Sequence, residues 1–249
     1  MEKNIAERIK VVVFDADDTL WANQPYFDEA EDSYSSLLSD YGETEYIKGE
    51  LFSTEMRNMD ELGFGATAFT LSMIETALRI GGESLPVSAV SDIYAIGRSL
   101  LRIPATPLEG VEETLQRLAG SRRFRLVVLT KGNLLDQERK LERSGLGRYF
   151  DHVEIVSDKN EKAYSDFVAF LGIDASEMIM VGNSFKSDIA PVLAIGGYGA
   201  YIPFHTTWQH ERAEEYSHPR LIRLDSIGQL PGMLLQATMP ESSGKASII

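Results

Sequence analysis

Residues 11–20 read Val-Val-Val-Phe-Asp-Ala-Asp-Asp-Thr-Leu, an apolar run that ends in a cluster of carboxylates. An unbroken apolar segment of this length is typical of a strand buried on both faces of a parallel sheet. Two carboxylates about 4 Å apart repel each other by about 4 kcal/mol at an effective dielectric constant near 20. Such a cluster is tolerated where it holds a divalent cation or where one acid keeps its proton. We therefore expect an active site at this strand end.

Five more segments resemble this first strand, and helical patterns lie between them. The strands are predicted at 124–130, 152–157, 178–183, 198–202 and 220–224, and the helices at 111–119, 134–144, 163–171 and 189–195. Strands that alternate with helices over short connections predict an α/β fold with a doubly wound, Rossmann-like parallel sheet. Residues 1–20 and 107–249 would form this core domain, with a loose tail at 241–249.

The interval 21–106 interrupts the alternation, because it contains no convincing buried strand. Helical stretches are predicted at about 28–40, 45–60, 66–80 and 87–101, and proline-containing segments at 23–25 and 104–107 suit a domain boundary. An insert that begins directly after the carboxylate cluster would lie above it. We predict an inserted α-helical cap domain.

Composition excludes several function classes. The chain has 249 residues, no cysteine and a net charge of −14, so disulfides, thiolate metal sites and cysteine nucleophiles are excluded. A strongly negative field repels nucleic acids and anionic membranes, and no segment is apolar enough to span a bilayer. Because the first residues also lack the apolar stretch of a secretory signal, we expect a cytoplasmic protein with neither nucleic-acid nor membrane partners.

Four ordered signals together resemble the haloacid dehalogenase-like (HAD) hydrolase superfamily, in its capped phosphatase branch. They are Asp15-x-Asp17-x-Thr19 after the first strand, Thr130 at the end of the second, Lys159 near the third and 182–188 (Gly-Asn-Ser-Phe-Lys-Ser-Asp) after the fourth. Each lies at the carboxyl end of a predicted strand, which makes the combination more specific than any single motif.

The resemblance implies an enzyme: a Mg2+-dependent phosphatase that hydrolyses a small phosphorylated substrate. Asp15 would be the nucleophile that forms an aspartyl-phosphate, and Asp17 the general acid and base. Asp17 would also bind the metal through its backbone carbonyl, whereas Asp18 is expected to bond backbone groups or face solvent. Thr130, with the next N–H groups and possible help from Lys131, would hold a phosphoryl oxygen.

Two motif positions stay open. Lys162 is an alternative to Lys159 as the phosphate-binding lysine, although it would fall in the first turn of a helix and point outward. Asn183 stands where many members of the superfamily have an aspartate that binds the metal. An amide oxygen can bind magnesium but carries no charge, so Asp188 would supply the acidic contribution, directly or through water.

Further candidates lie near the predicted site. Arg57 and Phe64 lie between helical patterns of the cap and could contact the substrate, although an interhelical turn with a salt-bridged arginine is the simpler interpretation. His205, with His210 and Glu211, follows the fifth strand. Since their spacing matches no standard metal site, packing against the cap or contact with the substrate is favoured for them.

Three other functions fit the same motifs. A metal-independent haloacid dehalogenase would need neither Asp17 nor Asn183 and Asp188. A phosphomutase would use the same groups on a sugar phosphate that binds again, and a non-catalytic binding protein would be expected to lack Asp15 or Lys159. These considerations favour the phosphatase, and leave the natural substrate and oligomeric state open.

Overall fold

A six-stranded parallel sheet forms the centre of the protein in the computed structural model, which describes residues 5–235. Its order is β3-β2-β1-β4-β5-β6. The strands are β1 (Val11–Phe14), β2 (Arg125–Lys131), β3 (His152–Val156), β4 (Met178–Gly182), β5 (Tyr198–Tyr201) and β6 (Leu221–Arg223). They occupy the six predicted segments, so the prediction of a doubly wound parallel sheet is confirmed. The predicted tail at 241–249 lies outside the described residues.

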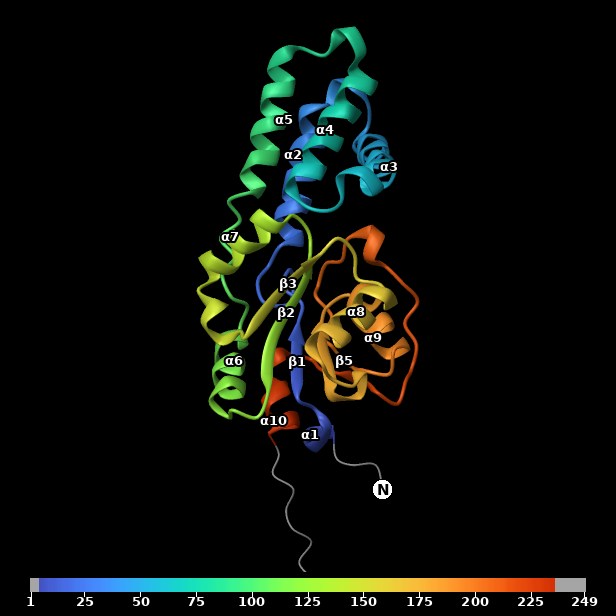
Figure 1. The fold of residues 1–249 in the computed structure, drawn as a ribbon. Helices are drawn as coiled ribbons and strands as arrows, with labels where there is room; N and C mark the ends of the chain where they lie inside the picture. The colour runs from blue at the N-terminus through green and yellow to red at the C-terminus, as the bar shows by residue number, and fades with distance from the viewer. Residues whose placement is uncertain (1–4, 236–249) are drawn as a thin grey trace, which may run out of the picture.

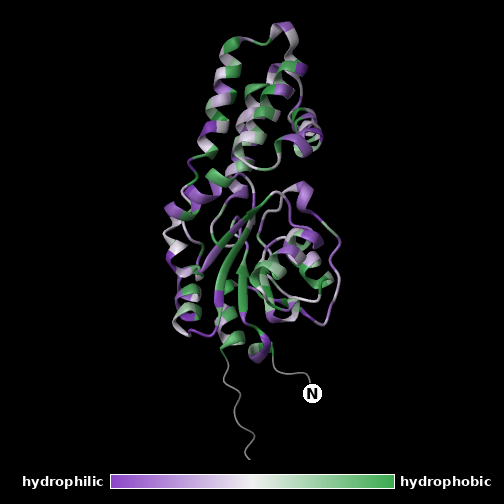
Figure 2. Cartoon of the chain, viewed as in Figure 1, coloured by the Kyte–Doolittle hydropathy of each residue, from purple (hydrophilic) through white to green (hydrophobic). Residues whose placement is uncertain are grey.

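Alternation along β1 explains why helices cover both faces of the sheet. Successive side chains of a strand point to opposite faces. Val12 and Phe14 join one apolar cluster with α6 (Val111–Gly120) and α10 (Leu230–Leu234). Val11 and Val13 join a second cluster with α8 (Glu161–Leu171) and α9 (Ala190–Ala194). Because β1 is buried on both faces, its residues must all be apolar (Figures 1 and 2).

The core helices agree with their predicted positions, with one difference. α7 (Leu134–Ser144) ends at Gly145, whose φ of 68° is the left-handed conformation that glycine adopts readily. The last predicted helix, 189–195, is instead a π-helical turn at Phe185–Ile189 followed by the short α9. The turn begins early because the Ser184 side chain accepts a hydrogen bond from the Ser187 N–H. At the N-terminal end of the described residues, α1 (Ile5–Arg8) precedes β1.

Four helices form the cap above the carboxyl edge of the sheet (Figure 1). They are α2 (Gln24–Leu37), α3 (Thr44–Leu62), α4 (Ala66–Gly81) and α5 (Val87–Leu100), all inside the predicted insert. They bury an apolar cluster of their own, which includes Tyr34, Leu51 and Met73. No helix within residues 5–235 has the length and apolarity that a membrane span requires.

Close packing of α4 against α5 depends on a glycine. A Cβ atom at Gly97 would overlap the side chain of Thr70, whereas a Cβ at Gly49, on the exposed side of α3, would meet nothing within 4 Å. We expect Gly97→Ala to lower the free energy of unfolding by about 1–3 kcal/mol, because the helices must move apart. Gly49→Ala should raise it by about 0.5–1 kcal/mol through helix propensity. Equal denaturant midpoints for the two variants would contradict this packing.

Candidate active site

The predicted motifs meet where the direction of the sheet's connections reverses. β2 and β4 lie on either side of β1, and the chain proceeds from them toward opposite edges. Ligands of open α/β sheets bind at such a switch point. A cavity of about 190 Å³ lies there, between sheet and cap. It is lined by eight of the predicted residues: Asp15, Asp17, Phe64, Thr130, Lys131, Lys159, Asn183 and Asp188.

Asp15 shares one buried ammonium with Asp188. The Nζ of Lys159 contacts Asp15 Oδ1 and lies 2.8 Å from Asp188 Oδ1, and all three side chains are at least nine-tenths buried. Burial and the neighbouring Asp188 raise the pKa of Asp15 to about 7, against the opposing effect of Lys159. Although burial disfavours its charge, the two carboxylates raise the pKa of Lys159. The group therefore carries at most one net negative charge.

The structure places Lys159, and not Lys162, beside Asp15. Lys162 lies in the first turn of α8, where it pairs with Asp166 at 2.5 Å and is 82% exposed. Lys159 precedes that helix, and Asn160 caps it by accepting a hydrogen bond from the N–H of Ala163. Because the helix begins only at Glu161, the Lys159 side chain is free to turn inward.

Asp188 reaches Lys159 because Gly182 has no side chain. A Cβ atom at Gly182 would overlap the Asp188 carboxylate, whose Oδ2 accepts a hydrogen bond of 3.0 Å from the Ser184 N–H. Both oxygens of Asp188 are thus bonded to protein groups. Asp188 is expected from the sequence to contribute to a metal site directly or through water, and in this arrangement its charge balances Lys159.

Three oxygen-bearing groups do converge beside Asp15. Thr19 Oγ1 donates to Asp15 Oδ2 and to Asn183 Oδ1, each at 3.1 Å. In its other amide orientation, Asn183 donates to Asp15 Oδ2 at 3.3 Å and to the Asp17 carbonyl oxygen at 3.2 Å. A carboxylate, a backbone carbonyl and the Asn183 amide, whose oxygen faces this place in the first of its two orientations, therefore surround one place. Such hard oxygen donors, completed by water, suit magnesium.

The charge at that place comes from Asp15 alone. Within residues 5–235, no group of three or more His, Cys, Asp or Glu side chains is arranged around a metal position. A cation would depend on the neutral oxygens of Asp17 and Asn183 in addition to the one carboxylate.

The Asp17 side chain is held by three donors, none of which the sequence analysis identified. Trp21 Nε1 and Gln137 Nε2 each donate to it at 2.8 Å. Lys140 Nζ, 2% exposed, lies 3.1 Å from both of its oxygens. Gln137 and Lys140 share one face of α7 with Asp136, whose carboxylate lies 3.6 Å from Lys140. Their helical spacing after the N-cap Asn133 was the available signal.

Asp18 was expected either to bond backbone groups or to face solvent, and it bonds backbone groups. Its φ of 62° turns the chain sharply, and its carboxylate accepts hydrogen bonds from the N–H groups of Asn23 and Gln24 at 2.8–3.0 Å. Burial raises the pKa of Asp18 to about 7, although these hydrogen bonds oppose the rise. Since α2 begins at Gln24, Asp18 connects the catalytic loop to the cap.

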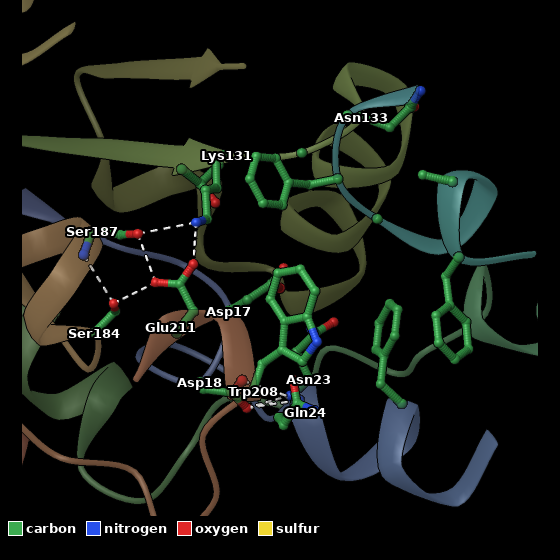
Figure 3. A pocket seen from close by; sticks show the side chains of 18 of the residues that line it. Asp17, Asp18, Asn23, Gln24, Lys131, Asn133, Ser184, Ser187, Trp208 and Glu211 are labelled. Carbon is green, nitrogen blue, oxygen red and sulfur yellow. Dashed lines mark hydrogen bonds and ion pairs between the residues drawn. The ribbon is translucent and has the colours of Figure 1, made fainter. Parts of the chain in front are cut away.

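Thr130 and Lys131 end β2 but differ in their surroundings. Thr130 is buried at the cavity, and Asn133, not Thr130, caps α7. Lys131 Nζ contacts Glu211, lies 3.0 Å from Ser187 Oγ and sits 4.3 Å from the centre of the Phe64 ring. Lys131 is therefore already paired with a carboxylate in this arrangement (Figure 3).

Glu211 is a carboxylate of the cavity that the motifs did not identify as part of the site. Its Oε2 accepts hydrogen bonds from Ser184 at 2.5 Å and Ser187 at 2.6 Å (Figure 3). Although burial opposes its ionisation, Lys131 and these hydroxyls hold the pKa of Glu211 at about 2. The sequence analysis considered Glu211 only together with His205 and His210, and favoured packing against the cap or contact with the substrate over a metal site.

Of the three predicted specificity residues, one lines the cavity and two do not. Phe64 lies at the turn between α3 and α4, where its ring packs edge-to-face on Trp208 at 6.1 Å between centroids. Arg57 contacts Glu75 at 3.4 Å and does not line the cavity, so the expected salt bridge is present, but Arg57 lies within α3 and not in an interhelical turn. His205 packs on Phe204 at 4.1 Å and is also outside the lining, whereas Thr206, Thr207 and Trp208 belong to it.

Replacing Glu211 should make the free energy of unfolding less dependent on pH in the acidic range. A carboxylate whose pKa falls from 4.5 to about 2 on folding stabilises the protein above pH 4.5, and loses this effect as the pH falls toward 2. We expect Glu211→Gln to lower the free energy of unfolding at pH 7 by on the order of 1–3 kcal/mol. In urea titrations, the difference from the parent should shrink below pH 4.5. The exposed Glu214→Gln is the control, and a difference that grows in acid would contradict the pairing.

Comparison with known proteins agrees with this geometry. The family model of the haloacid dehalogenase-like hydrolases matches residues 9–196. A haloacid dehalogenase-like hydrolase structure from Xanthomonas campestris is 35% identical, covers 92% of this chain and 91% of its own, and superposes with a TM-score of 0.82.

Two archaeal relatives carry the name glyceraldehyde 3-phosphate phosphatase. The protein of Methanopyrus kandleri is 27% identical over 73% of this chain and 78% of its own length. That of Methanothermobacter thermautotrophicus is 25% identical over 91% of this chain and 100% of its own. The matching family model, the doubly wound sheet and the motifs gathered at its switch point lead to one conclusion: the chain is a hydrolase of the haloacid dehalogenase-like family.

Proposed function

We propose that this hydrolase is a magnesium-dependent phosphatase that acts on a small phosphorylated metabolite through an aspartyl-phosphate at Asp15. The observation that carries the proposal is the double environment of the Asp15 carboxylate. One of its oxygens faces the Lys159 ammonium, and the other faces Thr19 and Asn183. Two relatives named as phosphatases support the same reaction class.

The bond changes follow from this placement. An oxygen of Asp15 attacks phosphorus, the ester bond to the leaving oxygen breaks, and Asp17 gives that oxygen a proton. Water then attacks the aspartyl-phosphate, Asp17 takes a proton from it, and Asp15 is regenerated with release of phosphate. Magnesium, held by Asp15, the Asp17 carbonyl and Asn183, would neutralise phosphoryl oxygens. Lys159 adds a second positive charge, so that one anion can approach another.

Other residues of the cavity have supporting roles in this proposal. Thr130, at the end of β2, is the hydroxyl donor for a phosphoryl oxygen. Lys131 is bonded to Glu211 and Ser187, so we assign it to the contact with Phe64 of the cap rather than to the phosphate. Lys140 contacts both oxygens of Asp17 and holds this carboxyl group in position for the two proton transfers.

The first test of the function compares phosphate release from an aryl phosphate by the parent and by Asp15→Asn. We expect the parent to be active with Mg2+ and inactive with a chelator. The variant should be slower by at least about 10³-fold, since it lacks the nucleophile. Re-addition of Mg2+ controls for chelator damage. Equal rates in all samples would refute the mechanism, and halide release from a 2-haloacid without metal would favour the dehalogenase.

A second test uses two lysines that are 22 residues apart. Lys140→Met removes the ammonium that contacts Asp17, and should lower kcat by about tenfold or more, because Asp17 loses a contact that orients it for proton transfer. Lys162→Met removes an exposed lysine and should leave kcat within about twofold. Steady-state rates on the aryl phosphate decide the outcome. Unchanged turnover in Lys140→Met, with a normal Tm, would exclude a role for Lys140 in the reaction.

A further inference from the structure

The two walls of the cavity differ in their cations, because lysines line only one of them. Three lysines line the core wall, and each is paired with a carboxylate: Lys131 with Glu211, Lys140 with Asp17 and Lys159 with Asp15. The cap wall contributes three acids, Asp28, Glu31 and Glu55, and no lysine or arginine. The phosphoryl group belongs at the core wall, beside Asp15, so the rest of the substrate faces the acidic wall.

Glu55 is the acid of this wall whose charge is least compensated. It projects from α3 into the cavity, and none of the lysines and arginines within residues 5–235 is placed as an ion-pair partner for it. Burial and the neighbouring Glu31 raise the pKa of Glu55 to about 8, while a hydrogen bond with the Trp208 side chain opposes the rise. A positive charge beside Glu55 would relieve both the burial cost and the repulsion.

Glu31 and Asp28 each have polar partners among the described residues. Lys48 lies 3.6 Å from Glu31, but its closer partner is the exposed Asp32 at 2.5 Å. Asp28 accepts hydrogen bonds from Gln24 at 2.8 Å and from Thr206 of the core at 3.0 Å. Glu31 therefore adds negative charge near Glu55, and Asp28 joins the cap to the loop that carries Trp208.

Aromatic rings line the same part of the cavity. Phe27 and Phe69 pack edge-to-face at 5.3 Å between centroids, and Phe64 packs in the same way on Trp208. Phe27 precedes Glu31 by one helical turn, so ring and carboxylate share a face of α2. The face of an aromatic ring attracts cations, and the ring of Phe64 already holds the Lys131 ammonium at 4.3 Å.

We propose that the leaving group of the substrate carries an ammonium group, which binds between Glu55, Glu31 and the aromatic rings of the cap wall. The preferred substrate is then a small phosphate monoester of an amino alcohol. Water cleaves its P–O ester bond to give the amino alcohol and inorganic phosphate. This inference rests on the proposed phosphatase function, because it concerns the other end of the same substrate.

The test compares three esters of similar length that differ in their terminal group. They are 2-aminoethyl phosphate, 2-hydroxyethyl phosphate and carboxymethyl phosphate, which end in an ammonium, a hydroxyl and a carboxylate. With Mg2+, we expect kcat/KM to be highest for the ammonium ester, by about tenfold over the hydroxyl ester, and lowest for the carboxylate. A parent enzyme that prefers the hydroxyl or carboxylate ester, or that does not discriminate, would overturn the inference.

Variants that remove one carboxylate test which residue is responsible for the preference for the ammonium ester. Glu55→Gln should lower the ratio of kcat/KM for the ammonium ester over the carboxylate ester by about tenfold. Glu83→Gln, which alters an exposed acid at the far end of the cap, should preserve the ratio. An unchanged ratio in Glu55→Gln, with Tm and aryl phosphate hydrolysis retained, would refute the role of Glu55.

Hydrolysis of the aryl phosphate distinguishes a failure of the proposed substrate class from a failure of the proposed phosphatase function. If the parent hydrolyses it but shows no preference for the ammonium ester, the substrate class is wrong and the phosphatase function stands. If the parent releases phosphate from neither the aryl ester nor any of the three small esters, both proposals fail.

Discussion

One buried ammonium, that of Lys159, makes the arrangement of the site possible. It lies between the carboxylates of Asp15 and Asp188, which would otherwise repel each other by several kcal/mol in a partly desolvated place. The three side chains follow different strands, so one ionic contact fixes three loops at the carboxyl edge. Removing one partner of a buried ionic group costs about 3–5 kcal/mol. Gly182 is part of the same constraint, because only the absence of a side chain there leaves room for Asp188.

The other two lysines of the cavity repeat this principle between other segments of the chain. Lys140 of α7 holds Asp17 and also donates to the Asn23 side chain at 2.8 Å, so it connects the catalytic loop with the entry to the cap. Lys131 of β2 holds Glu211 from the segment after β5. Because each charge already has a partner, the polar floor of the cavity is preorganised before any substrate enters.

The sequence was sufficient for the fold and for those site residues that follow strands. Apolar runs locate parallel strands, and the carboxyl ends of such strands must meet, so Asp15, Thr130 and Asn183 could be placed together in advance. Lys140 was missed because α7 carries many charged residues, and only the assembled fold decides which of them faces Asp17. Arg57 of the cap and His205 of the core could not be placed, because the orientation of the cap determines which side chains of either part line the cavity between them.

The bond between Asp18 and the first N–H groups of α2 has a mechanical meaning. The residue lies three positions beyond Asp15, yet it fastens the first helix of the cap. A displacement of α2 relative to the sheet would therefore pull on the loop that carries Asp15. One carboxylate thus ties the position of the cap to the geometry at the carboxyl edge of the sheet.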